Sequence, residues 1–186
     1  WNSLTGGYLT TRFGYDSWGN QVSTTLPLGA VTTTAFDPAY RTFPVQQCDA
    51  LGRCTTRTWD AVLGLETSNT DVNGTSTFTS YDTFGRPLAE SKGAHQVQYS
   101  YLSWGDPNAQ RVRQTIVDGS AEGLWIDTYS DGLGRAWRKA KKGGTIQDVL
   151  FSDASSRPWK RSAWYVAGET PRYQVFAYDG SGRVRS

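Results

Sequence analysis

The chain has 186 residues, enough for one domain with a hydrophobic core. Its net charge of +2 is too balanced to indicate a nucleic-acid surface, so no nucleic-acid partner is predicted. No run of about 18 apolar residues is present, which argues against a membrane span. Aromatic residues make up 13% of the chain, a content typical of strands joined by tight turns and not of disorder.

Turn residues and alternating segments succeed one another along the chain. Pro27 with Gly29 comes first, followed by Asn73-Gly74, a strong cue for a hairpin. Segments 96–102 and 111–116 then alternate apolar and polar residues, which favours strands, and segment 172–178 repeats the pattern with apolar groups on both faces. Helical periodicity is nearly absent. The sequence therefore predicts an all-β fold, an antiparallel array of hairpins.

A short phrase built on Asp, Gly and Arg recurs along the chain. Its copies are "YDSWGN" (15–20), "CDALGR" (48–53), "YDTFGR" (81–86), "SDGLGR" (130–135), "SDASSR" (152–157) and "YDGSGR" (178–183), with looser copies "FDPAYR" (36–41) and "WDAVLGL" (59–65). Several intervals between the Asp residues are near 11 or its double, roughly one strand plus one tight turn per step. No linker divides the repeats, so residues 1–186 are predicted to form a single segment. Because both ends fall inside the pattern, we expect this segment to be a fragment of a longer chain.

The phrase Asp-x-x-Gly-Arg has the chemistry of a hairpin turn. The Asp side chain can accept hydrogen bonds from backbone N–H groups two residues on, and Gly can take a positive φ to close a type I turn with a bulge. In such a three-residue loop the Asp and the Arg face each other. The predicted turn-forming residues are Asp16, Gly19, Asp49, Gly52, Arg53, Asp82, Gly85, Arg86, Asp131, Gly134, Arg135, Asp179, Gly182 and Arg183.

The same register predicts the pairs that lie further from each turn. Cys48 would face Cys54, and these are the two cysteines of the chain. Such a pair is not hydrogen-bonded, so its Cβ atoms come close enough for a cross-strand disulfide. The alternative is two free thiols on a strand face, and an exported protein would favour the disulfide. At another turn, Tyr129 would pair with Trp137.

Chemistry beyond turns is sparse in this sequence. His95 is the one histidine, and no Gly-x-Ser-x-Gly elbow accompanies it. One His and two Cys that face each other do not suit zinc, and Asp-x-Asp-x-Asp spacing for calcium is missing. We therefore predict no enzymatic activity, no cofactor and no metal.

Two alternatives to a structural role stay open. Trp18, Trp104 and Trp164 lie near predicted turns and could stack on sugars, which would suit a module that binds carbohydrate or a cell surface. Glu90 and Glu169 could form the carboxylate pair of a β-rich glycosidase, although nothing local marks them.

The recurring phrase resembles the YD repeat, also called the RHS repeat, of bacterial RHS toxins, of Tc-toxin B and C components and of teneurins. Segments 32–74 and 150–184 resemble stretches of Tc-toxin B components, the first of them following the SpvB-like region. The resemblance implies a segment of a coiled β-sheet shell that encapsulates a toxin or passenger polypeptide. It also implies two partners, flanking RHS repeats of the same protein and the enclosed polypeptide, and a bacterial protein that is secreted or at the cell surface. The self-cleaving aspartyl protease of that family is not recognisable here.

Overall fold

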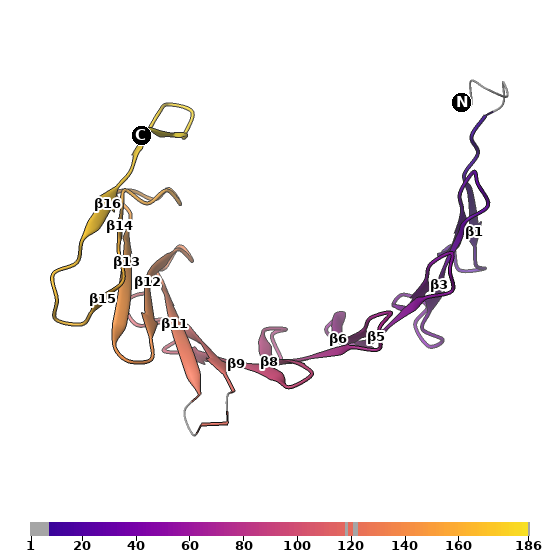
Figure 1. Cartoon of the computed structure of the whole chain (residues 1–186), viewed down its shortest axis with the longest axis horizontal. Helices are drawn as coiled ribbons and strands as arrows, with labels where there is room; N and C mark the ends of the chain where they lie inside the picture. Colours follow the sequence, from indigo (N-terminus) through magenta and orange to yellow (C-terminus); the bar gives the residue numbers. More distant parts are fainter. Residues whose placement is uncertain (1–7, 118, 121–122, 186) are drawn as a thin grey trace. The chain divides into compact units, whose positions relative to one another are not determined.

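The computed structural model of the chain describes residues 8–117, 119–120 and 123–185 (Figure 1). Strands joined by turns make up this part of the chain, and none of its residues lies in a helix. The predicted all-β antiparallel hairpin array is thereby confirmed. The chain divides into two compact units, Trp1–Ala94 (unit 1) and His95–Ser186 (unit 2). The prediction that residues 1–186 form one segment of a longer chain stays a prediction.

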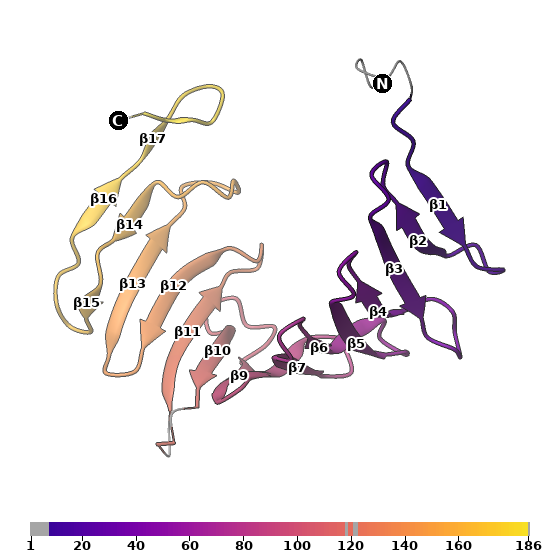
Figure 2. The same ribbon diagram turned by 45° about the vertical axis from the view of Figure 1, so that its right-hand side comes forward.

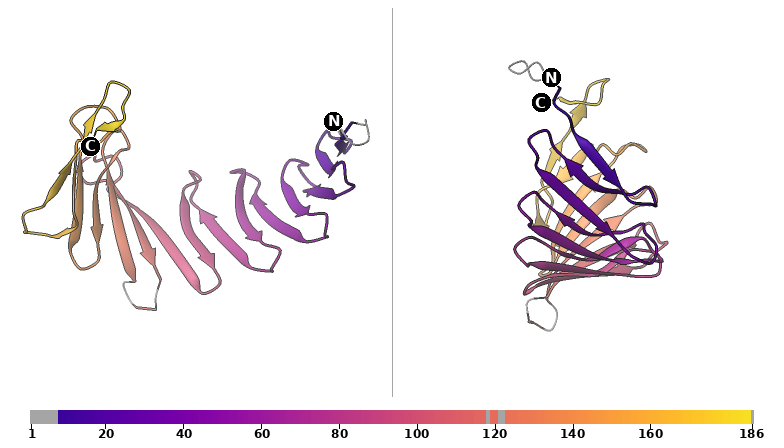
Figure 3. Two further views of the ribbon diagram at one scale, coloured as in Figure 1. Left: turned by 45° about the horizontal axis from the view of Figure 1, so that its top comes forward. Right: turned by 90° about the vertical axis from the view of Figure 1, so that its right-hand side faces the viewer.

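Unit 1 is a sequence of antiparallel strands in which neighbours in the chain are neighbours in the sheet (Figure 3). Each pair is joined by a turn of a few residues, so every strand obtains its backbone hydrogen bonds from the strands beside it. The strands are β1 (Arg12–Tyr15), β2 (Gln21–Thr25), β3 (Val31–Phe36), β4 (Pro44–Cys48), β5 (Cys54–Asp60), β6 (Leu65–Thr70), β7 (Ser76–Tyr81) and β8 (Pro87–Lys92).

Unit 2 begins with the same meander and ends less regularly (Figure 2). Its sheet has the order β9-β10-β11-β12-β13-β14-β16, β15 pairs with β13, and β17 pairs with β18 in a separate hairpin. The strands are β9 (His95–Leu102), β10 (Arg111–Ile116), β11 (Leu124–Ser130), β12 (Ala136–Lys141), β13 (Thr145–Leu150), β14 (Lys160–Ser162), β15 (Tyr165–Val166), β16 (Tyr173–Val175), β17 (Ala177–Tyr178) and β18 (Val184–Arg185).

A β-bulge follows several of the turns. Ser130 pairs with Ala136 and Tyr129 pairs with Arg138, so Trp137 is the additional residue of β12. The predicted pair of Tyr129 with Trp137 is therefore wrong by one residue, because turn spacing alone does not reveal an inserted bulge. The two rings still meet, with centroids 5.5 Å apart. A bulge bends its strand and increases the local twist of the sheet.

The strands bury little apolar surface against one another. Among the described residues no hydrophobic side chain is buried, and the buried polar residues are Asp127, Asp148 and Ser162. The hydrophobic core that the chain length would allow is thus not found in this part of the chain. The described residues also contain no helix long and apolar enough to cross a membrane.

Candidate functional site

The turn at Asp82 shows how the repeated phrase folds. The backbone N–H groups of Phe84 and Arg86 both donate to Asp82 Oδ1 at 2.9 Å. Gly85 N–H donates to the Asp82 carbonyl at 3.0 Å, and Asp82 N–H donates to the Arg86 carbonyl at 2.9 Å. Gly85 has a φ of 76°, which a residue with a Cβ atom adopts only at a cost. One carboxylate therefore fixes three residues of loop backbone.

The same arrangement recurs at four other copies of the phrase. In each, the Asp carboxylate accepts from the backbone two and four residues on, and the fourth residue is a Gly with a φ between 74° and 87°. The copies are Asp16 with Gly19, Asp49 with Gly52 and Arg53, Asp131 with Gly134 and Arg135, and Asp179 with Gly182 and Arg183. At the first copy Asn20 takes the place of Arg, and its Nδ2 donates to Asp16 Oδ2 at 3.1 Å.

These contacts lower the pKa of the turn carboxylates. The guanidinium of Arg53 and its backbone N–H are the main causes at Asp49, and Arg183 acts in the same way at Asp179. At Asp82 partial desolvation is the largest single effect and raises the pKa, but the hydrogen bonds from Arg86 and Phe84 together outweigh it. The lowered pKa values mean that these carboxylates stay ionised at lower pH than a free Asp side chain does.

The turn opened by Asp71 has the same geometry and was not predicted from the sequence. The turn opened by Leu26 shows that the loop can form without an Asp carboxylate. Asp71 accepts from the N–H groups of Asn73 and Thr75, and Gly74 N–H donates to the Asp71 carbonyl, so this loop has three residues and not the two of an Asn-Gly turn. The Asp-x-x-Gly spacing of "DVNG" could have revealed it. Leu26 closes the same loop with backbone hydrogen bonds alone.

Three copies of the phrase form other structures. Asp37 opens a longer loop and accepts from the N–H groups of Tyr40, Thr42 and Phe43, which outweigh desolvation and lower its pKa to about 2. Asp60 opens a turn closed by a hydrogen bond from Gly64 N–H to the Asp60 carbonyl. Asp153 accepts from Ser155 N–H but lies in a loop outside any strand. Without Gly at the fourth position, the three-residue loop does not form.

The two cysteines occupy one cross-strand pair of β4 and β5. Cys48 pairs with Cys54 in the strand register, and a disulfide joins them with a Cα–Cα distance of 4.0 Å. The turn between them is the one opened by Asp49. The disulfide therefore closes the β4–β5 hairpin covalently.

Each residue considered for other chemistry is exposed. His95 begins β9 and is exposed, and Glu90 and Glu169 lie in different units. Trp18 is 67% exposed beneath the Arg41 guanidinium, and Trp164 lies under Lys141 Nζ at 3.8 Å. Trp104 meets Tyr101 edge-on at 6.1 Å. Within the described ranges no group of three potential metal ligands is found.

One face of unit 2 carries ion pairs that were not predicted from the sequence. Asp127 on β11 is 2% exposed, and its carboxylate accepts from Arg113 Nε at 2.7 Å and from Arg111 Nε at 3.1 Å. Arg113 also stacks over Trp125 at 4.1 Å. Charged residues two positions apart at the start of β10, and an Asp between two aromatic residues at every second position of β11, could have indicated these contacts, because paired residues on neighbouring strands share a face.

A second polar cluster joins β12, β13, β14 and β15. Arg138 Nε donates to Asp148 Oδ1 at 2.6 Å, Tyr165 Oη donates to Asp148 Oδ2, and the Asp148 N–H donates to Ser162 Oγ at 2.8 Å. Burial, together with the hydrogen bond to the carboxylate, raises the pKa of Tyr165 to about 12. The cluster satisfies its own members and ties the irregular end of unit 2 to the sheet.

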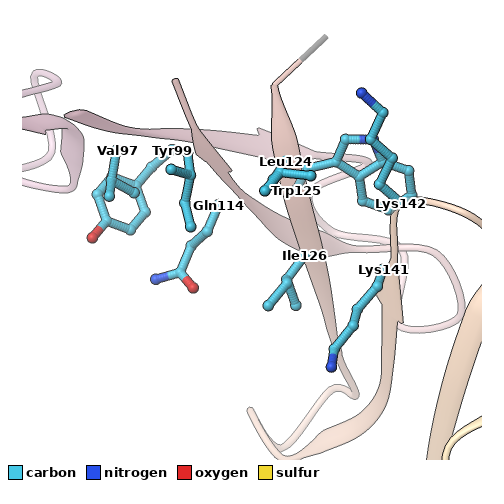
Figure 4. A pocket seen from close by; sticks show the side chains of 9 residues that line it. Val97, Tyr99, Gln114, Leu124, Trp125, Ile126, Lys141 and Lys142 are labelled. Atoms are coloured by element: carbon cyan, nitrogen blue, oxygen red, sulfur yellow. The ribbon is translucent and has the colours of Figure 1, made fainter. Parts of the chain in front are cut away.

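The opposite face of unit 2 holds an open apolar groove (Figure 4). The strand register places Tyr99 beside Gln114 and Gln114 beside Ile126, so these side chains share a face. The groove has a cavity volume of about 420 Å³, and it is lined by Val97, Tyr99, Gln114, Ile116, Leu124, Trp125, Ile126, Lys141 and Lys142. It offers contact to an apolar group and contains no arrangement of a nucleophile with a base.

Fold and turns together define an all-β protein built from repeated antiparallel hairpins. No family model matches the chain. Double-stranded DNA deaminase toxin A of Burkholderia cenocepacia (strain H111) is 32% identical to it over 151 residues, which is 81% of this chain and 10% of that protein. The chain thus spans about a tenth of the length of this curated relative.

Solved structures of Tc toxins also resemble the chain. They include TcdB2-TccC3, with and without its hypervariable C-terminal region, at a TM-score of 0.31, and a mutant of the Photorhabdus luminescens Tc holotoxin pore at 0.30. Each is 12% identical and covers 94% of this chain, while this chain covers 15% of each. These TM-scores are too low to support the fold assignment. The all-β assignment therefore depends on the strand pairings of this chain.

Proposed function

We propose that this chain is a non-enzymatic segment of an RHS-repeat shell that encapsulates a toxin or passenger polypeptide. The observation that carries the proposal is a meander of repeated hairpins whose described hydrophobic side chains are all at least partly exposed. A sheet of this kind has apolar faces that another polypeptide can cover. Flanking repeats of the same protein would continue the strand order.

Two further observations support a role outside the cytosol. The Cys48–Cys54 disulfide is suited to an oxidising compartment, as in a secreted or surface protein. The curated relative is described as a toxin, and this chain matches a small part of it, as a scaffold segment would. The deaminase activity in its name belongs to that protein.

Protease protection tests the proposal in the protein that carries this chain. We expect a passenger polypeptide to resist cleavage while the repeats are folded and to be degraded once urea unfolds them. A released, unprotected passenger added to the folded repeats is the control and should be degraded at once. Equal cleavage of the passenger in the presence and absence of urea would contradict encapsulation.

The alternative of a carbohydrate-binding module stays a prediction. Trp18 is its best anchor, because its ring is largely exposed. Tight glycan binding by the chain that is lost in Trp18→Ala, with the fold intact, would favour this function over the shell.

A further inference from the structure

A second cavity in unit 2 has a cationic lining. It has a volume of about 580 Å³, and its lining includes three cations, Arg135, Lys139 and Arg161, an apolar wall of Leu133, Val149 and Phe151, and no carboxylate. The cavity opens on the same face as the apolar groove, because Lys139 pairs with Thr128 and Lys141 pairs with Ile126.

The strand register builds this cavity. Lys139 on β12 lies beside Gln147 on β13, and Val149 on β13 lies beside Arg161 on β14. Two cations therefore stand on strands that flank β13 on either side, with an amide and an aliphatic side chain between them. Such a spacing allows one anionic group to meet both cations.

The three cations differ in what already binds them. Arg135 pairs with Asp131, donates to the carbonyls of Asp153 and Ser155, and stacks over Phe151 at 4.4 Å. Arg161 stacks over Phe176 at 5.6 Å, and neither Arg161 nor Lys139 forms an ion pair with any described carboxylate. Their charges are the ones that a ligand would neutralise.

The net charge of unit 2 has the same sign as the charged side chains that line the cavity. Unit 1 has six Lys and Arg residues against eight Asp and Glu residues, whereas unit 2 has thirteen against nine. The net charges are therefore −2 and +4. An anionic partner would be attracted to unit 2 and not to unit 1.

We propose that this cavity binds a side-chain carboxylate of an acidic, aliphatic polypeptide segment. Lys139 and Arg161 would bind the carboxylate, and the apolar wall of Leu133, Val149 and Phe151 would contact the neighbouring aliphatic side chain. A free inorganic anion would use the cations and leave that wall without a contact. The inference deepens the proposed function, since it gives the chemistry of the enclosed polypeptide where it meets unit 2.

Titration of the chain with short peptides tests the proposal. The probe is an acetylated, amidated peptide of alternating Leu and Glu, compared with the same peptide in which Gln replaces Glu, at low salt and by calorimetry. We expect the Glu peptide to bind about tenfold tighter, because hydrogen bonds to charged groups are the strong ones. The double variant Lys139→Gln with Arg161→Gln should lose this preference.

A matched variant controls for the loss of two positive charges. Arg12→Gln with Lys92→Gln changes two exposed cations of unit 1 and should leave binding within about twofold of the unchanged chain. Circular dichroism of each variant establishes that the sheet is intact. A preference for the Glu peptide that survives in the Lys139 and Arg161 variant would overturn the assignment.

Inorganic phosphate separates a polypeptide site from a free-anion site. We expect phosphate to compete weakly, and binding of phosphate as tight as that of the Glu peptide would refute the polypeptide assignment. These binding results do not depend on whether the chain encapsulates a polypeptide. If the passenger is not protected but the Glu peptide still binds, the shell proposal is wrong and the cavity assignment holds. If the passenger is protected but the Glu peptide does not bind, the cavity assignment is wrong and the shell proposal holds.

Discussion

Asp82 and Arg86 face each other across a three-residue loop, with Arg86 Nε donating to Asp82 Oδ2 at 2.7 Å. The same distance recurs between Asp49 and Arg53, and again at the copies after β11 and β17. The carboxylate therefore has two tasks in each turn: one oxygen fixes the loop backbone, and the other pairs with the cation.

The turn carboxylates should make the fold sensitive to acid. Because the folded state lowers their pKa, the unfolded chain binds protons more readily, and the stabilisation present above about pH 4 is lost as pH falls. For Asp37 the loss should extend down to its pKa of about 2. Urea unfolding followed by tryptophan fluorescence between pH 6 and pH 2 measures this.

Asp37→Asn provides the matching variant for that titration. It should be less stable than the unchanged chain at pH 6, and its stability should fall less steeply below pH 4, while Glu90→Gln should follow the unchanged chain. Identical slopes for the chain and its Asp37 variant would show that this carboxylate does not couple folding to protonation.

Gly52 and Gly85 form a matched pair for testing the turn backbone. Both have a positive φ, so Ala at either position should cost about 1–2 kcal/mol of unfolding free energy. A Cβ at Gly52 meets nothing within 4 Å, whereas one at Gly85 would lie 3.1 Å from Leu65 Cδ1. Gly85→Ala should therefore be the more destabilising change in a urea titration, and the opposite order would contradict the turn geometry.

The disulfide should contribute modestly to stability. Its cysteines are separated by six positions, so the closed loop is short and its loss should cost about 2 kcal/mol. The double variant Cys48→Ser with Cys54→Ser should unfold at a lower urea concentration and should no longer respond to reductant. A reductant effect that persists in this variant would have another origin.

Asp127 should be the most sensitive carboxylate of unit 2. Asp127→Asn would remove the negative charge that Arg111 and Arg113 share, at a cost of about 1.5–3 kcal/mol. The loss of stability would be larger if these ion pairs were completely buried, but both guanidinium groups are partly exposed. Chemical denaturation with the exposed Glu90→Gln as control checks it, and equal stability of the two variants would count against a structural ion pair.

Local chemistry made the fold class and the turn positions predictable. Gly at the fourth position restricts the loop to one geometry, and the loop length then places Cys48 across from Cys54 whatever the rest of the sheet does. The bulge at Trp137 was not predictable in this way, because it depends on how β12 packs and twists against β11.

Contacts between strands distant in sequence were the part that could not be predicted. The cationic cavity requires Lys139 and Arg161 to flank β13, and β14 follows β13 only after a loop whose Asp153 resembles a turn former but forms none. Asp71 was overlooked for a different reason: Asn73-Gly74 is itself a familiar turn signal and masked the longer loop.

Cryo-electron microscopy of the protein that carries this chain is the most direct measurement. We predict that strands β1 to β16 form part of a wall, with Tyr99, Ile126 and Lys139 facing the density of an enclosed polypeptide. A map in which that face meets bulk solvent, or is covered by a second folded layer of the same sheet, would contradict the shell.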